Sequence, residues 1–116
     1  MVSSNQWARL RPDQTASLRR GAWYRVMRLT PVEAVLDVHG RPTPVARPSL
    51  QIVTTPPTRW TVVPRPQGAG GRLPLTWGPR YGVCPNCRER ARLEARAASM
   101  RCPKCNGFFD IGWDDW

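Results

Sequence analysis

Four cysteines carry the most specific chemistry in this chain of 116 residues. They form two C-x-x-C pairs, Cys84-Pro-Asn-Cys87 and Cys102-Pro-Lys-Cys105, with fourteen residues between the pairs. Two such pairs fit one tetrahedral metal site, two disulfides or redox-active dithiols. The sequence around the cysteines must therefore decide between metal binding and sulfur redox chemistry.

Metal binding is the interpretation that the surrounding sequence favours. A tetrahedral Zn²⁺ takes four thiolates at about 2.3 Å, and each C-x-x-C turn brings two sulfurs to the same ion. Redox-active pairs of the thioredoxin kind precede a helix in a βαβ unit, and the sequence has no such pattern. Because four thiolates leave no position open for water, the expected ion is structural rather than catalytic. We therefore expect one structural Zn²⁺ with the ligands Cys84, Cys87, Cys102 and Cys105.

The segment GVCPNC…MRCPKCNGFFDI resembles the zinc-ribbon family, which has knuckles of the form C-P-x-C and a final strand of the form G-x-F-x-I. The resemblance covers residues 83–116. It implies a structural metal on the four cysteines and a last strand in which Phe109 and Ile111 pack against the ribbon's own core. Gly107 is expected to supply the positive φ at which the chain reverses after the second knuckle.

The segment RERARLEARAAS, residues 88–99, lies between the two knuckles and is rich in helix-forming Ala, Arg, Glu and Leu. A ribbon needs a strand there instead, with Ala91 and Leu93 facing inward and Arg90 and Arg92 facing out. Metal geometry overrides weak local propensity, so we expect strand, turn and strand, with a helix as the alternative.

Residues 7–63 show the pattern of short strands. Gly21 to Leu29 alternates between two faces and is rich in aromatic and β-branched residues, which favour strands. His39-Gly40 is expected to form a hairpin turn. The expected strands cover residues 21–29, 32–38, 50–54 and 59–63, with an edge strand at residues 7–10.

Four or five short strands joined by tight turns favour a small closed or half-closed β-barrel. The segment LRRGAWYRV and the strands after it resemble the small barrels of the Src-homology-3 (SH3) type. Pro64 to Gly82 is crowded with proline and glycine, which cannot sustain a helix or a central strand. We therefore expect a mainly β fold: a basic SH3-like β-barrel in residues 1–63, a linker in 64–82 and a four-cysteine zinc ribbon in 83–116.

A formal charge of +10 and a sequence pI near 11.2 point to an anionic partner such as nucleic acid. The alternative is that the positive charge has no binding purpose. Of the 18 basic residues 17 are arginine, and alanine and proline are also abundant, which is the composition that a GC-rich genome produces without selection for function. Residues 1–82 carry a formal charge of +9 and residues 83–116 carry +1. The binding face is therefore expected on the N-terminal module.

RNA or DNA is the partner that this charge distribution favours. An exposed aromatic residue beside arginines would stack on unpaired bases, and Trp23-Tyr24 puts one ring on each face of its strand. The alternative is that both rings pack the barrel. The expected nucleic-acid contacts are Arg19, Arg20, Trp23, Tyr24, Arg25, Arg28, Arg41, Arg47, Arg59 and Arg65.

Catalysis is not expected. His39 is the only histidine and is expected to be an exposed turn residue, and the sequence has no nucleophile elbow, phosphate-binding glycine loop or paired carboxylates. We therefore expect a non-enzymatic protein without a small-molecule substrate. Docking onto a larger transcription, translation or enzyme assembly is the alternative to nucleic-acid binding.

The two ends of the sequence add two expectations. The N-terminus has no apolar run of signal-peptide length, and no stretch reaches the roughly 20 apolar residues of a membrane span. We therefore expect a cytoplasmic protein that does not enter a membrane, in a compartment where thiols stay reduced. The C-terminal DIGWDDW is expected to fold back onto basic residues of the N-terminal barrel, and docking of a basic partner protein is the alternative.

Overall fold

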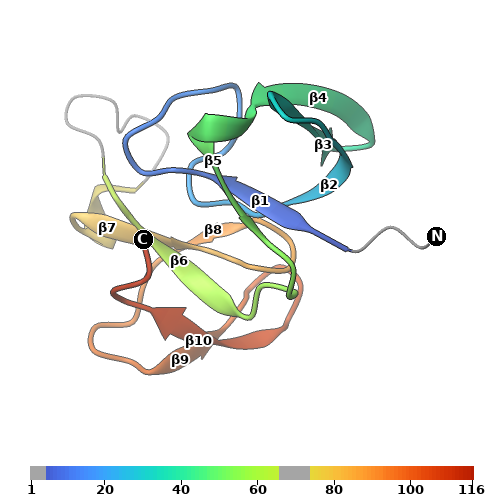
Figure 1. The fold of residues 1–116 in the computed structure, drawn as a ribbon. Coiled ribbons are helices and arrows are strands. Elements are labelled where there is room, and N and C mark those ends of the chain that lie inside the picture. Colours follow the sequence, from blue (N-terminus) through green and yellow to red (C-terminus); the bar gives the residue numbers. More distant parts are fainter. Residues whose placement is uncertain (1–4, 66–73) are drawn as a thin grey trace. The chain divides into compact units, whose positions relative to one another are not determined.

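The computed structural model describes residues 5–65 and 74–116 and divides the chain into two compact units, Met1–Pro57 and Thr58–Trp116. Each unit holds one five-stranded sheet (Figure 1). The helices of the described residues are two single 3₁₀ turns, η1 (Arg47–Ser49) and η2 (Leu75–Trp77). The expected mainly β fold is confirmed. In the described part of the chain, no helix is long and apolar enough to cross a membrane.

Unit 1 is an antiparallel sheet with the strand order β4-β3-β2-β1-β5. Its strands are β1 (Trp7–Leu10), β2 (Tyr24–Leu29), β3 (Glu33–Val38), β4 (Arg41–Ala46) and β5 (Leu50–Val53). The register shifts between Val26 and Arg28 where β2 meets β3, and such a bulge bends a strand. The sheet therefore curls into a half-barrel of the expected small-barrel kind.

Two strands of unit 1 differ from the sequence-based expectation. The segment Trp7–Leu10 is expected at an edge, but β1 lies between β2 and β5 and pairs with both. β4 is not among the expected strands because it contains Pro42 and Pro44. These prolines are tolerated because β4 is the edge strand, where one row of N–H groups needs no partner.

The turn between β3 and β4 consists of His39 and Gly40. Both have positive φ, 54° and 81°, which is the type I′ geometry that matches the twist of a hairpin. The Gly40 N–H donates to Asp37 Oδ1 at 2.8 Å. His39 is exposed at this tip. The predicted hairpin turn is confirmed.

Unit 2 is a mixed sheet with the strand order β8-β7-β6-β10-β9. Its strands are β6 (Arg59–Pro64), β7 (Arg80–Val83), β8 (Arg90–Ala91), β9 (Ser99–Arg101) and β10 (Phe108–Gly112). β10 runs parallel to β6, with Ile111 beside Trp60, and the other pairs are antiparallel. The last strand of the chain therefore joins a strand from its middle.

The division of the chain differs from the expected one. Residues 59–63 are expected in the N-terminal barrel, but β6 forms its hydrogen bonds with β7 and β10 of unit 2. β7 in turn takes up residues 80–82 of the expected linker. Residues 66–73 of that linker lie outside the described residues. The sheet around the cysteines is thus larger than a ribbon of residues 83–116 alone.

Residues 88–99 form a two-residue strand and a turn, as expected, and not a helix. Ala91 is buried, Leu93 is half-buried and Arg92 is exposed, in agreement with the expected alternation. Arg90 is half-buried and its Nε is buried, so it does not simply face out. The chain reverses at Arg96, which has a φ of 60°.

The core of unit 2 surrounds Trp60, which is fully buried. Its indole Nε1 donates to the Met100 carbonyl at 3.1 Å, so the only polar atom of the side chain is satisfied. Val62, Ala91, Ile111 and two of the cysteines pack in the same cluster. Ile111 is buried and Phe109 is half-buried against this core, as the resemblance implied.

Gly82 is the position in β7 where this core leaves no room for a side chain. A Cβ there would lie 3.0 Å from Trp60 Cε3 and 2.9 Å from Leu93 Cδ2. Leu93 has freedom to move, but the Trp60 ring is enclosed. We expect Gly82→Ala to lower the free energy of unfolding by about 1–3 kcal/mol, the usual cost of overpacking. Chemical denaturation of the metal-loaded protein measures this change. An unchanged denaturation midpoint would show that position 82 has room for a methyl group.

Candidate metal centre

Each C-x-x-C pair closes a hairpin of unit 2, the first after β7 and the second between β9 and β10. The two turns are built alike. Arg88 N–H donates to the Cys84 carbonyl at 3.1 Å, and Asn106 N–H donates to the Cys102 carbonyl at 3.0 Å. The first cysteine of each pair also donates its own N–H, to Glu89 O at 2.9 Å and to Gly107 O at 2.7 Å. The same backbone fold is therefore used twice.

The residue after each second cysteine has a left-handed backbone, with φ of 66° at Arg88 and 65° at Asn106. The positive φ was expected at Gly107 instead, and this expectation is wrong. Asparagine adopts the left-handed region readily, so the reversal needs no glycine. Gly107 is instead a position with no room for a side chain, since a Cβ there would lie 2.6 Å from the Phe109 ring.

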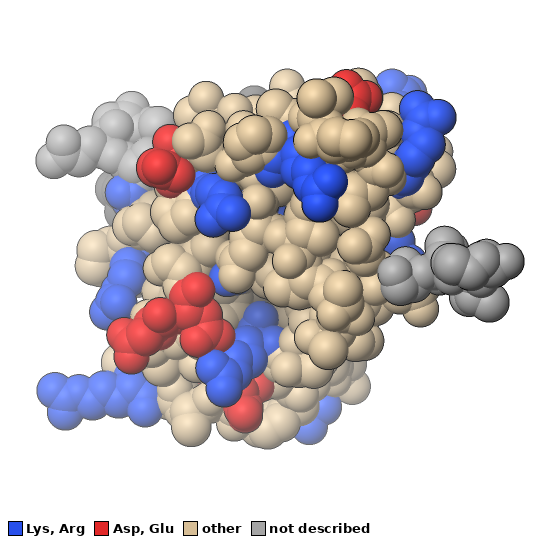
Figure 2. Space-filling view, viewed as in Figure 1, with Lys and Arg blue, Asp and Glu red and all other residues tan. Residues whose placement is uncertain are grey.

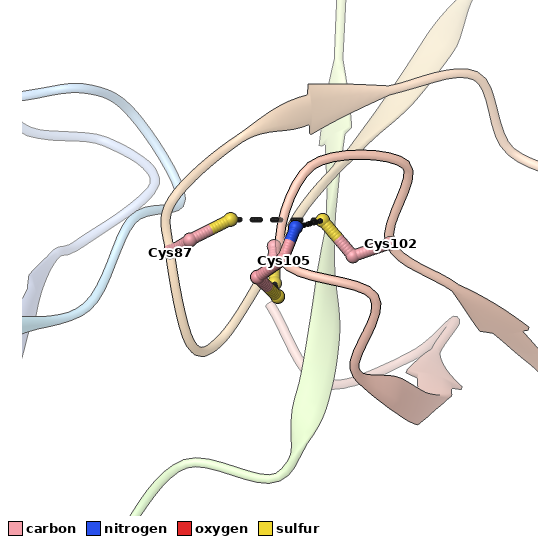
Figure 3. A group of neighbouring side chains, drawn as sticks. Cys87, Cys102 and Cys105 are labelled. Carbon is pink, nitrogen blue, oxygen red and sulfur yellow. Dashed lines mark hydrogen bonds between the residues drawn. The ribbon is translucent and has the colours of Figure 1, made fainter.

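The four sulfurs of the two knuckles all lie within 4.8 Å of one another. Figure 3 labels three of these side chains, Cys87, Cys102 and Cys105. Cys84 Sγ is 3.7 Å from Cys105 Sγ, and Cys87 Sγ is 3.6 Å from Cys102 Sγ. A disulfide would need about 2.05 Å, and all four cysteines are free. A tetrahedral ion with metal–sulfur bonds of about 2.3 Å places its ligands about 3.8 Å apart. The four cysteines are therefore positioned to bind one metal ion.

Backbone amides point at the sulfurs, as they do around a thiolate. Asn86 N–H donates to Cys84 Sγ at 3.4 Å, and Lys104 N–H donates to Cys102 Sγ at the same distance. A second amide, that of Cys105, reaches Cys102 Sγ at 3.5 Å. These donors stabilise negative charge on sulfur, which is the form that binds a metal.

Burial acts against these donors. Removal from water raises the pKa of Cys84 and, to a smaller extent, that of Cys87. Hydrogen bonds from the Asn86 side chain and from the Gly107 backbone lower the pKa of Cys105 to about 6. A buried thiolate needs a positive partner nearby, and a cation between the four sulfurs would provide it.

No protein-family model, curated protein or solved structure matches the chain. The cysteine cluster agrees with the zinc-ribbon pattern inferred from the knuckles, and this agreement depends on the sulfur geometry alone.

The two aromatic residues predicted to stack on bases are both buried. Trp23 is 8% exposed and Tyr24 is 4% exposed. The Tyr24 hydroxyl accepts a hydrogen bond from Arg19 N–H at 2.9 Å, and the Arg9 guanidinium lies 4.4 Å from the Trp23 ring centre. These rings pack unit 1, which was the alternative interpretation, and they offer no open stacking surface.

The predicted arginines fall into two groups. Four of them are exposed on unit 1: Arg25, Arg28, Arg41 and Arg47. Two of these four are also hydrogen-bonded within the protein, since Arg25 donates to Asn5 Oδ1 and Arg47 Nη1 donates to the Thr30 carbonyl at 3.0 Å. Two of the remaining arginines bind backbone carbonyls. Arg20 donates to the carbonyls of Pro12 and Gln14 at 2.9 Å, and Arg65 donates to the carbonyls of Gly78 and Pro74 at 3.0 and 2.7 Å.

Arg59 is paired within unit 2, since its Nη1 lies 3.1 Å from Asp115 Oδ1. The acidic C-terminal segment therefore folds back onto a basic residue, as expected, although that residue belongs to unit 2. Arg101 and Lys104 add further positive charge on the same unit.

Charge is shared equally by the two units, each of which carries a formal +5. The expected excess of positive charge on the N-terminal module included the arginines of residues 58–82, which belong to unit 2. On the face shown in Figure 2, basic side chains are set apart by uncharged and acidic surface. Basic residues of both units are therefore available to an anionic partner.

Proposed function

We propose that the chain is a non-enzymatic zinc protein that binds nucleic acid, with one structural Zn²⁺ on Cys84, Cys87, Cys102 and Cys105. The arrangement of the four sulfurs is the observation that carries the zinc assignment, because its contacts of 3.6 and 3.7 Å agree with the edge of a tetrahedron of thiolates around zinc. Four thiolates complete the coordination shell, which fits a structural ion. Elemental analysis is expected to find one zinc per chain, and iron in its place would contradict the assignment.

The nucleic-acid part of the proposal is supported by charge. The chain carries a formal charge of +10, and Arg25, Arg28, Arg41 and Arg47 are exposed on unit 1. Contact with phosphates releases counterions and rewards such a charge. Because Trp23 and Tyr24 are buried, unit 1 is proposed to contact the sugar-phosphate backbone and not the bases.

Gel-shift titration against single- and double-stranded RNA and DNA tests this proposal. We expect affinity to fall steeply with salt, with a log–log slope of about −0.7 to −0.9 for each phosphate neutralised. Replacing Arg28 and Arg41 by glutamine is expected to make that slope shallower by about 2, roughly one for each lost contact. The substitution Arg92→Gln, at an exposed residue of unit 2, is the control. An absence of binding at low salt, or a flat salt response, would refute the proposal.

Docking onto a protein partner is the second candidate, and a groove on unit 1 favours it. The groove has a volume of about 380 Å³ and combines two arginines with apolar walls: Arg11, Pro31, Arg47, Pro48, Leu50 and Ile52. This mixture suits an extended acidic peptide. A partner that remains bound in nuclease-treated lysate, and is lost on Arg47→Gln, would support docking over nucleic-acid binding.

A further inference from the structure

A second groove lies on unit 2, and none of the arginines predicted to contact nucleic acid lines it. It has a volume of about 420 Å³ and is lined by Arg80, Ala95, Arg96 and Trp113. All four residues belong to Thr58–Trp116, so the groove is complete within one unit. It joins residues from the start of β7, the turn before β9 and the segment after β10.

The Trp113 ring is held in place from its edge. Its Nε1 donates to the Ala97 carbonyl at 2.8 Å, which fixes the plane of the indole. The Arg80 guanidinium lies 5.3 Å from the centre of the ring, within the range of a cation–π contact. The groove thus has a fixed, half-buried aromatic ring that also packs against the core of unit 2, and a planar cation lies over this ring.

Both charged residues in the wall of the groove are cationic. Arg96 and Arg80 are exposed. Asp115, two residues after Trp113 in the sequence, pairs with Arg59 at 3.1 Å, which offsets its repulsion of an anion. An occupant should therefore be flat and should carry negative charge next to its flat part.

We propose that this groove binds an unpaired base of single-stranded nucleic acid, with the base stacked on the pair formed by Arg80 and Trp113 and the adjoining phosphate at Arg96. Bases stack on aromatic rings and on guanidinium planes, and the adjacent backbone supplies the anion. This inference rests on the proposed nucleic-acid function. It moves base contact from Trp23 and Tyr24, which are buried, to unit 2.

An acidic peptide would match the charge of the groove but not its flat aromatic surface. Its carboxylates match the two arginines, but an aliphatic acidic side chain cannot stack on the flat pair formed by Arg80 and Trp113. Nucleic acid supplies both groups in one repeating unit. Competition by poly-glutamate as strong as that by an oligonucleotide of equal charge would overturn the assignment.

The test uses the full-length, zinc-loaded protein and two single-stranded DNA oligonucleotides of about 12 nucleotides, within the usual site size of such modules, one normal and one with abasic sites throughout. Only the normal strand can stack its bases on the groove, so we expect it to bind roughly tenfold more tightly than the abasic strand. Trp113→Phe is expected to reduce this preference. Arg96→Gln is expected to weaken binding of the normal strand about three- to tenfold, while the matched substitution Arg92→Gln leaves it unchanged.

The outcomes separate the two proposals. If neither strand binds, both the proposed function and this inference fail. If the two strands bind equally, or if Arg96→Gln and Arg92→Gln behave alike, the groove is not the base site, while backbone binding by unit 1 stands. Arg96 is exposed, so its substitution gives a result even where Trp113→Phe impairs folding.

Discussion

Replacing Cys102 by serine is expected to unfold unit 2 and to leave unit 1 folded. Cys102 is 1% exposed, and its sulfur accepts two backbone N–H groups and lies 3.6 Å from that of Cys87. Structural Zn²⁺ binding contributes about 10–16 kcal/mol in zinc-finger peptides, as much as the whole net stability of a typical domain. Loss of one thiolate removes a large part of this contribution, so the small sheet around the site should not persist.

Amide hydrogen exchange, resolved along the chain, measures this effect for each unit. Protection is expected to be lost over β6 to β10 and kept over β1 to β5. Chelation of the wild-type protein should give the same pattern, and added zinc should reverse it. Lys104→Gln lies in the same knuckle and keeps all four thiolates, so it should behave as the wild type. Persistent protection of β9 and β10 in the Cys102→Ser protein would contradict a metal-dependent fold.

The metal centre is the feature that the sequence predicts best, because its information is local. A C-x-x-C turn brings two sulfurs together by its own backbone, and two such turns need only to face each other. The same holds for the hairpin turn, since His39 and Gly40 both accept positive φ. A feature that depends only on the spacing and the backbone preferences of a few neighbouring residues can be inferred without knowing the rest of the fold.

Strand partners are not local, and here the sequence-based boundaries differ from the structure. The alternation in residues 59–63 indicates a strand, but it says nothing about which sheet receives it. The deciding contact is the parallel pairing of Ile111 with Trp60, between residues far apart in the chain. The proline- and glycine-rich composition of residues 64–82 likewise hid β7, whose pairing with β6 and β8 overrides weak propensity.

Exposure is the other property that residue type does not reveal. Trp23 and Tyr24 are expected on opposite sides of their strand, yet both are buried. The Arg9 guanidinium lies over the Trp23 ring, and the Arg19 N–H donates to the Tyr24 hydroxyl. Trp113 lies outside the expected strands, so no alternation predicts its exposure. Arg80 and Arg96 are distant from it in the sequence and meet it only in the folded chain. An aromatic residue near arginines therefore needs the tertiary structure before it can be assigned to stacking.

Replacing Trp60 by alanine is expected to destabilise the metal-binding unit by about 3–5 kcal/mol, the usual cost of deleting a large buried aromatic side chain. Trp60 is fully buried, packs with Cys84 and Cys102, and donates to the Met100 carbonyl. The substitution removes this packing and this hydrogen bond. Denaturation followed by residue-resolved hydrogen exchange should show the loss in β6 to β10.

The matched substitution Trp7→Ala tests where β6 belongs. Trp7 lies in β1 and pairs with Arg25 and Val53 of unit 1, so its loss is expected to weaken β1 to β5 and to spare the metal centre. If residues 59–63 belonged to the N-terminal barrel, as their alternation alone would allow, Trp60→Ala and Trp7→Ala would weaken the same strands. Opposite patterns would establish that the four-cysteine cluster is supported by a sheet whose central strand, β6, lies before the cysteines in the sequence.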